Sequence, residues 1–293
     1  MAFGPHLLLA VLEGLVTSAV LALTALGLSL VFGVMRVVNV AHGELFMLGA
    51  VLAWAIATSI GGSPAVGFMA ALVLAPLIVG AVALAAERLV LRKVNYDPEA
   101  TIVATIGLLY IIQQLALTFY GADARPVPPP FNMRISLPWF GYSGYKLSII
   151  AASALLLVVS WLVMTKTKAG LIMRATQYDR ETAQAFGIPV DRVYAGVFAL
   201  GAMLAAIAAV LIVPISQAHY LMGQDPLLLS FIVVIIGGLG SLRGTVVAAV
   251  LIGVSDGVIS MFFSPTLAKM IATLLVAMVL VFRPQGLFGR AVR

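Results

Sequence analysis

A short polar stretch between the first two apolar runs of the sequence holds residue types that could contact a solute. Arg36, Asn39, His42 and Glu44 lie within nine residues of one another, with Gly43 between the last two. Two interpretations are open. The stretch forms a turn in water with glycine as a helix cap, or it forms a polar break at membrane depth, which marks a translocation pathway.

The length of the following apolar run favours the break. Residues 45–60 cover about 24 Å at 1.5 Å per residue, which is less than the ~30 Å hydrocarbon core of a bilayer. To span a membrane, this run must include residues 39–44, which would bring His42 and Glu44 near or into the membrane. The predicted pathway residues here are Asn39, His42, Gly43 and Glu44.

A second apolar run, 227–236, is shorter still and leads into a glycine-rich stretch, Gly237-Gly-Leu-Gly-Ser-Leu-Arg-Gly244. Unwound backbone is tolerated in a membrane only where it is buried in protein or lines a cavity. An ordinary cytoplasmic turn is again the alternative. The pathway residues predicted from this stretch are Gly237, Gly238, Gly240 and Ser241.

Asp256 lies in the middle of an apolar segment, IGVSDGVISM. It is either a pathway residue that faces the bundle interior or a packing residue that hydrogen-bonds a neighbouring serine or backbone group. Hydrolytic chemistry has little support, because the sequence contains neither H-E-x-x-H nor G-x-S-x-G, and its three histidines are far apart. The sequence also has no cysteines, which excludes disulfides, thiol catalysis and cysteine metal sites. From the missing motifs, the separated histidines and the missing cysteines together, we expect no metal site and no enzyme.

The composition indicates an integral membrane protein. The 293 residues are 62% hydrophobic and 10% charged, with a mean hydropathy of +1.14, whereas soluble domains carry about 25% charged residues. We predict an all-α, polytopic helical bundle that forms one transmembrane domain over residues 1–293. It should hold about eight to nine membrane-spanning helices, two of them short or broken. The apolar segments are roughly 7–35, 40–60, 65–87, 100–120, 147–165, 193–213, 227–240, 245–263 and 267–282.

The positions of the basic residues predict the orientation of this bundle. Arginine and lysine gather at 88–93, 166–192 and 283–293. The positive-inside rule makes these segments cytoplasmic, with the N-terminus outside and the C-terminus inside. Membrane topology therefore explains the net charge of +6, and we expect a lipid bilayer and no nucleic acid as a partner.

The segment 166–192 is the one long stretch expected outside the membrane. Leu171, Ala175, Tyr178, Thr182 and Phe186 recur at spacings of three or four, which predicts an amphipathic helix over 171–186. Such a helix either lies on the lipid surface or docks into a groove on another protein. Its acidic residues argue against a purely lipid-binding face.

This segment also resembles a motif of a known family. Glu181-Thr-Ala-Gln-Ala-Phe-Gly187 is similar to the E-A-A-x-x-x-G loop, through which permeases of ABC importers place a coupling helix in their ATPase, although Thr182 replaces the first alanine. Longer stretches resemble the permease subunits of high-affinity branched-chain amino acid ABC importers, and together they cover essentially the whole chain. They are GLSLVFGVMRVVNVAHGELFMLGA (27–50), TKAGLIMRATQYDRETAQAFGIPVDRV (167–193), GGLGSLRGTVVAAVLIGV (237–254) and FRPQGLFGR (282–290).

The resemblance implies a permease subunit in the bacterial inner membrane. It would pair with a second, related permease, receive its ligand from a periplasmic binding protein and be driven by two cytoplasmic ATPases. No G-x-x-x-x-G-K-[ST] occurs in this chain, so the partner ATPases would bind ATP and Mg²⁺, and this chain would bind no cofactor. The predicted ATPase-coupling residues are Arg174, Asp179, Glu181, Ala183, Phe186 and Gly187.

The sequence leaves other functions open. Related permeases are thought to carry urea, short amides or other amino acids. A passive channel or an ion-coupled carrier also uses broken helices, but such a protein has no evident need for the 166–192 segment.

Overall fold

Helices form almost the whole chain in the computed structural model, which describes residues 3–60, 62–283 and 285–288. The all-α prediction is therefore confirmed. The elements are α1 (Phe3–Met35), α2 (His42–Ser59), α3 (Pro64–Ala86), the π-helical turn η1 (Glu87–Leu91), α4 (Pro98–Tyr120), β1 (Arg134–Ser136), β2 (Gly141–Ser143), α5 (Gly144–Lys166), α6 (Lys168–Tyr178), α7 (Arg180–Ala185), α8 (Val190–Ser216), α9 (Gln224–Gly237), α10 (Leu242–Phe262) and α11 (Pro265–Phe282).

Each of the nine predicted apolar segments coincides with a helix. Among the described residues, eight helices are long and apolar enough to cross a membrane, with α3 and η1 counted together, while α9 is apolar but has only 14 residues. Local signals set several helix starts. Ser63, Asp97 and Ser264 cap α3, α4 and α11 with their side chains, and each precedes a proline at the first helical position. The chain is a multi-pass membrane protein.

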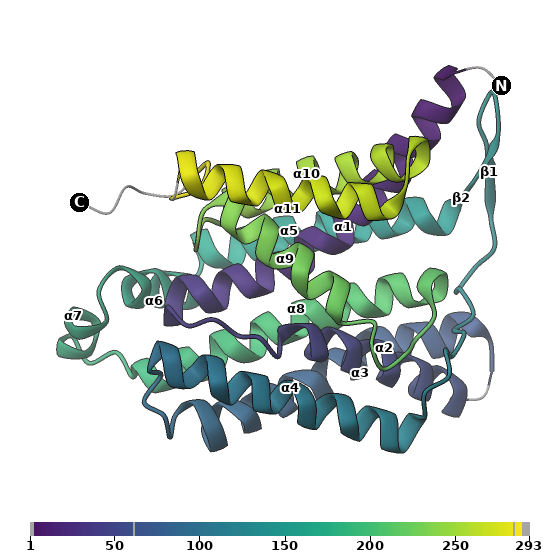
Figure 1. Cartoon of the computed structure of the whole chain (residues 1–293). Coiled ribbons are helices and arrows are strands. Elements are labelled where there is room, and N and C mark those ends of the chain that lie inside the picture. Colours follow the sequence, from purple (N-terminus) through teal and green to yellow (C-terminus); the bar gives the residue numbers. More distant parts are fainter. Residues whose placement is uncertain (1–2, 61, 284, 289–293) are drawn as a thin grey trace.

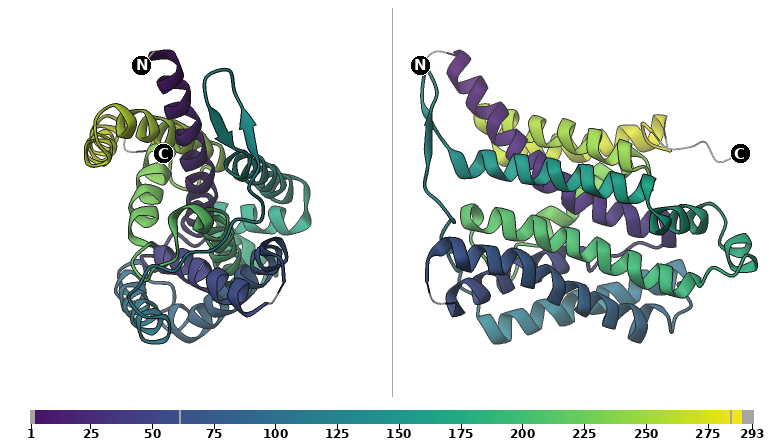
Figure 2. Two further views of the ribbon diagram at one scale, coloured as in Figure 1. Left: turned by 90° about the vertical axis from the view of Figure 1, so that its right-hand side faces the viewer. Right: turned by 180° about the vertical axis from the view of Figure 1, so that it is seen from behind.

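The bundle has two distinct ends. The α6–α7 pair lies at one end and the β1–β2 hairpin at the other (Figure 1). α1 begins at the hairpin end, and α11 finishes at the α6–α7 end (Figure 2). These two ends, the hairpin end and the α6–α7 end, are the reference points for depth in the bundle.

The helices before and after α5–α7 form two repeats of opposite orientation. In the first repeat, α1–α4, helix α2 contacts α3 and α4; in the second, α8–α11, helix α9 contacts α10 and α11 in the same way. The first helix of each repeat packs against the other repeat: α1 contacts α9 and α10, and α8 contacts α2 and α3. α1 runs towards the α6–α7 end, whereas α8 runs away from it (Figure 1). α1 and α8 therefore lie centrally, with α2–α4 to one side and α9–α11 to the other (Figure 2, left).

In each repeat an irregular segment separates the first helix from the second. Segment 36–41 follows α1, and segment 217–223 follows α8. Arg36 and Gln217 open these segments with left-handed φ angles of 57° and 61°, which are uncommon for residues other than glycine. In both cases the N–H still donates to the carbonyl four residues earlier. A residue other than glycine with a positive φ thus ends the first helix of both repeats.

Small residues allow the central helices to pack closely. A Cβ on Gly201 of α8 would lie 2.7 Å from the carbonyl oxygen of Gly27 on α1. Nearer the hairpin end, a Cβ on Gly14 of α1 would lie 2.9 Å from the carbonyl oxygen of Gly253 on α10. Such contacts are typical of membrane bundles, where close backbone packing takes the place of the hydrophobic effect between helices.

Candidate functional site

α2 begins deep inside the bundle, at the end of segment 36–41. The His42 side chain is fully buried, and its Nε2 lies 2.9 Å from the carbonyl oxygen of Thr24. Thr24 precedes the end of α1 by about 16 Å at 1.5 Å per residue. His42 therefore lies near the middle of the bundle and not in a turn at its end.

The polar groups at this break are only partly paired. Because the Thr24 carbonyl can only accept, His42 Nε2 carries the proton and Nδ1 is left as an acceptor. Nδ1 of His42 and Oε2 of Glu44 are buried and have no hydrogen-bond partner among the described residues. Asn39 is buried as well, and its Oδ1 accepts from the backbone N–H of Ala41 at 3.1 Å. The segment thus brings buried, unpaired polar atoms to mid-depth.

The breaks of the two repeats meet at Gly43. A Cβ on Gly43 would overlap the carbonyl oxygen of Gly223, and it would also lie 2.7 Å from the Cβ of Leu227 on α9. Gly223 is the last residue before α9. The starts of α2 and α9 therefore face each other inside the bundle. From there α2 runs towards the hairpin end and α9 towards the α6–α7 end. The sequence interpretation missed segment 217–223 as the partner of the first break.

The four residues predicted from the second glycine-rich stretch lie elsewhere. Gly237 ends α9, and Gly238, Gly240 and Ser241 form the turn to α10 at the α6–α7 end. Gly240 packs against Gly33 of α1, where a Cβ would lie 2.8 Å from the Gly33 Cα. This turn is not brought together with His42. Asp256 is half-buried on α10, within electrostatic range of Asp225 near the start of α9.

The segment after α5 folds as two helices, so the predicted single helix over 171–186 is wrong. Asp179 leaves helical geometry (φ −151°, ψ 109°) and caps α7. Its carboxylate accepts hydrogen bonds from the Thr182 hydroxyl at 2.6 Å and from the Thr182 N–H at 3.0 Å. These bonds lower the pKa of Asp179. The chain turns at this residue, and the predicted apolar stripe is divided between α6 and α7.

The aromatic residues of this stripe point away from the bundle. Tyr178 is 79% exposed and Phe186 is 84% exposed. Arg174 and Glu181 are exposed too, whereas Ala183 is buried and serves packing. Large exposed aromatic side chains outside a membrane are typical of a protein interaction surface.

Gly187 ends α7 with a left-handed φ of 80°. Its N–H donates to the Gln184 carbonyl, and the N–H of Ile188 donates to the Ala183 carbonyl. This is the Schellman arrangement, which favours glycine at this position. Gly187 therefore fixes how the chain leaves α7 towards α8.

α6 is attached to both repeats through Gln177. The Gln177 side chain donates to the Gly240 carbonyl at 3.3 Å, and the Gln177 carbonyl accepts from the Arg36 guanidinium at 3.3 Å. Gln177 also closes over the contact between Gly33 and Gly240. One residue of α6 therefore contacts the segment that leads to His42 and the turn between α9 and α10.

α7 is attached to the bundle through a different group. The Arg180 guanidinium lies 5.9 Å from the Tyr96 ring centroid and 5.5 Å from that of Tyr194. The two rings pack edge to face, with centroids 4.8 Å apart. Tyr96 precedes α4 and Tyr194 is in the first turns of α8, so α7 contacts both repeats as well.

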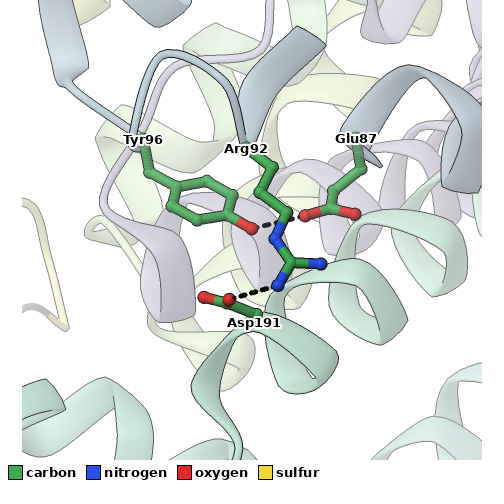
Figure 3. A network of polar contacts seen from close by, with 4 residues as sticks. All are labelled: Glu87, Arg92, Tyr96 and Asp191. Atoms are coloured by element: carbon green, nitrogen blue, oxygen red, sulfur yellow. Dashed lines mark hydrogen bonds and ion pairs between the residues drawn. The ribbon is translucent and has the colours of Figure 1, made fainter. Parts of the chain in front are cut away.

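A polar network supports these tyrosines (Figure 3). Tyr96 Oη donates to Oε1 of the buried Glu87 at 2.5 Å, and Arg92 forms an ion pair with Asp191 of α8 at 2.7 Å. Burial, together with the hydrogen bond to Glu87, raises the pKa of Tyr96. Because Arg92 directly follows η1 and Asp191 belongs to α8, their ion pair ties the α3–α4 connection to the second repeat.

Comparison with known proteins identifies the family of this chain. A model of the permease component of branched-chain amino acid transport systems matches residues 10–282. The chain belongs to this family. The permease is 27% identical to the high-affinity branched-chain amino acid transport system permease protein LivH of Escherichia coli (strain K12), over 95% of this chain and 94% of LivH. It is 28% identical to the corresponding protein BraD of Pseudomonas aeruginosa, over 97% of this chain and 96% of BraD.

A permease for another kind of solute is also similar. The ribose import permease protein RbsC of Haemophilus influenzae is 25% identical, over 61% of this chain and 58% of RbsC. The family resemblance predicted from the sequence is therefore confirmed. Within this permease, the predicted site residues fall into four places: the mid-depth break, the α9–α10 turn, the α6–α7 segment and Asp256 on α10.

Proposed function

We propose that this chain is the membrane permease subunit of an ATP-driven importer of branched-chain or related amino acids in the bacterial inner membrane. Family membership supports the class of protein, and the names of LivH and BraD support the class of solute. The observation that carries the coupling role is the exposed α6–α7 surface. Its aromatic residues face outward while Gln177 and Arg180 tie it to both repeats.

The distribution of charge supports a cytoplasmic α6–α7 end. Among the described residues, this end holds basic residues from the α3–α4 connection, the α6–α7 segment, the start of α10 and the end of α11. By the positive-inside rule, the N-terminus is then outside and the C-terminus inside. Arg290 and Arg293, which belong to the predicted C-terminal cluster, lie outside the described residues.

The proposal assigns ATP hydrolysis to other subunits. Two cytoplasmic ATPases bind ATP and Mg²⁺. One of them receives Tyr178 and Phe186 of this chain on its surface. A second, related permease completes the passage, and a periplasmic binding protein delivers the solute at the hairpin end. Arg174, Asp179, Glu181 and Gly187 shape and flank the docking surface, and this chain itself needs no cofactor.

The contacts of α6 and α7 suggest how ATPase movement reaches the pathway. When the ATPases close, they displace α6, which contacts Arg36 and Gly240. α7 moves with it and displaces the Tyr96–Tyr194 pair. Both repeats are then moved from the same end, as in a rigid-body switch between two packed arrangements. Asn39, His42, Gly43 and Glu44 lie at the junction of the repeats, where we place the constriction of the pathway.

Uptake by the reconstituted complex tests this function. The chain is assembled in proteoliposomes with the second permease, the ATPases and the binding protein, and radiolabelled leucine is supplied outside. We expect uptake that requires ATP and stops when the ATPase lysine of the phosphate-binding loop is replaced. Uptake of urea or a short amide in place of leucine would move the chain to another solute class. Sustained solute flux through this chain alone, without nucleotide, would contradict the proposal.

A further inference from the structure

Three charged residues of the second repeat lie at the same depth. Asp225 on α9, Asp256 on α10 and Lys269 on α11 lie about 18, 21 and 20 Å along their helices from the α6–α7 end, at 1.5 Å per residue. Three helices thus agree on one level, which lies about 9 Å from the hairpin end of α10 and about 6 Å from that of α11. This level falls within a hydrocarbon core of about 30 Å.

The three charges interact with one another. Lys269 Nζ lies 2.7 Å from Asp225 Oδ2, and Asp256 is within electrostatic range of both. The other two ion pairs of the described residues lie near the ends of the bundle. Arg92 and Asp191 are at the α6–α7 end, and Lys146, near the start of α5, pairs with Glu13 at the hairpin end. The Asp225–Lys269 pair is therefore the deepest of the three, with Lys269 on the hairpin side of the middle of α11.

The Asp225–Lys269 pair is open to the outside of the chain. The Lys269 side chain is 40% exposed and that of Asp225 is 65% exposed. Lys269 also lines a surface groove along α11 with Thr266, Met270 and Thr273. α11 lies at the periphery of the bundle (Figure 2, left), so nothing in the described residues covers this face.

Lipid is a poor neighbour for such a face. Charged side chains at bilayer depth are costly unless they pair in the bundle interior or face a water-filled cavity. Pairing alone does not remove this cost here, since more than half of the Asp225 side chain stays exposed. From the geometry we infer that the face around Asp225, Asp256 and Lys269 lines the water-filled passage of the importer, with the second permease as the opposite wall.

The chemistry of this face fits the ends of a zwitterion. Two carboxylates can accept hydrogen bonds from the ammonium group of an amino acid, and the Lys269 ammonium can donate to its carboxylate. A sugar or urea has no charged group that requires such partners. The inference rests on the proposed import function and adds to it the residues that contact the solute on this side of the passage.

Cysteine accessibility tests the position of this face, because the chain has no cysteines of its own. Met270→Cys is compared with Ile111→Cys on α4, in the assembled complex with cysteine-free partners. Both native side chains are highly exposed, at 66% and 57%, and they lie about 18 and 20 Å from the α6–α7 end. We expect Met270→Cys to react with a charged, membrane-impermeant thiol reagent at least tenfold faster than Ile111→Cys. Equally slow rates would place the face in lipid or in a dry interface and overturn the inference, whereas equally fast rates would support it and place α4, the counterpart of α11 in the first repeat, beside water as well.

A charge series tests contact with the solute. We expect Lys269→Met to lower leucine uptake at least tenfold and Lys269→Arg to retain most of it. Equal uptake by Lys269→Met and the wild type would remove Lys269 from the solute contacts. The wild-type complex is measured first. If it imports no amino acid, the proposed function fails, whereas slow labelling of Met270→Cys in a working importer refutes the passage alone.

Discussion

Replacing Arg180 with alanine should loosen α7 from the bundle by a calculable amount. The guanidinium contacts two rings, those of Tyr96 and Tyr194, at centroid distances of 5.9 and 5.5 Å. A cation–π contact at an exposed site contributes about 0.5–1 kcal/mol, so two contribute about 1–2 kcal/mol. Since 1.4 kcal/mol corresponds to a tenfold change in an equilibrium constant, the local opening equilibrium of α7 should shift by about 5- to 30-fold.

Hydrogen exchange measures this opening directly. Amide exchange in a peptide covering residues 180–192 reports the open fraction of α7 when closing is fast. We expect Arg180→Ala to speed this exchange about 5- to 30-fold, and Arg180→Lys to speed it less, because the cation is kept. Arg88→Ala is the matched control, since Arg88 lies at the same end and has no hydrogen-bond or ion-pair partner among the described residues.

A double-mutant cycle separates the ring contact from the loss of charge. In a Tyr194→Leu background, Arg180→Ala should have a smaller effect than in the wild type, because one ring contact is already gone. Exchange in Arg180→Ala that matches the wild type, or that matches Arg88→Ala, would refute the attachment of α7 through the tyrosines.

Three further changes test other parts of the fold. Gly43→Ala should lower the thermal unfolding midpoint in detergent, by the equivalent of about 1–3 kcal/mol, because its Cβ overlaps backbone. Gly107→Ala, whose Cβ meets open space, should leave the midpoint unchanged. Equal midpoints for the two variants would contradict the close contact at Gly43. Tyr96→Phe leaves a buried carboxylate without its donor, so it should lower the midpoint by the equivalent of about 1–3 kcal/mol or more of unfolding free energy. A similar loss in Tyr194→Phe would point to a general effect. Gly187→Pro cannot adopt a φ of 80°, so uptake should be lost while membrane insertion, measured in isolated membranes, is kept; normal uptake would exclude the role of α7.

The membrane helices and the first break could be predicted from the sequence for one physical reason. Bilayer thickness fixes the length of a spanning helix, so long apolar runs identify helices and the short run 45–60 identifies a break. The depth of His42 follows from the same length argument. The hydrogen bond to Thr24, by contrast, depends on how α1 and α2 pack, which no local pattern encodes.

The second break could not be found in this way. Segment 217–223 lies between Pro214 and Pro226 and has the composition of an external loop. Its position is apparent only from the packing of Gly223 against Gly43. The repeats are equally hidden, since helix length and direction relate them and no shared motif does. Lys269 was overlooked because it lies within an apolar segment, and its exposure depends on the tertiary packing.

The division of the α6–α7 segment had a signal that periodicity concealed. Spacings of three and four continue through residues 171–186, yet Asp179 is a strong helix N-cap and is followed three residues later by Thr182. The capping bonds at Asp179 therefore outweigh the continuous pattern and start a new helix.

Site-specific photocrosslinking tests most directly whether a separate ATPase binds α6 and α7. A photoreactive phenylalanine is placed at Tyr178 or Phe186, and at Trp139 on the hairpin end as a control that is 65% exposed. We predict crosslinks to the ATPase from the first two positions, with yields that change when ATP is added, and none from Trp139. Absence of ATPase crosslinks at Tyr178 and Phe186 in a complex that imports leucine would contradict the coupling role of this segment.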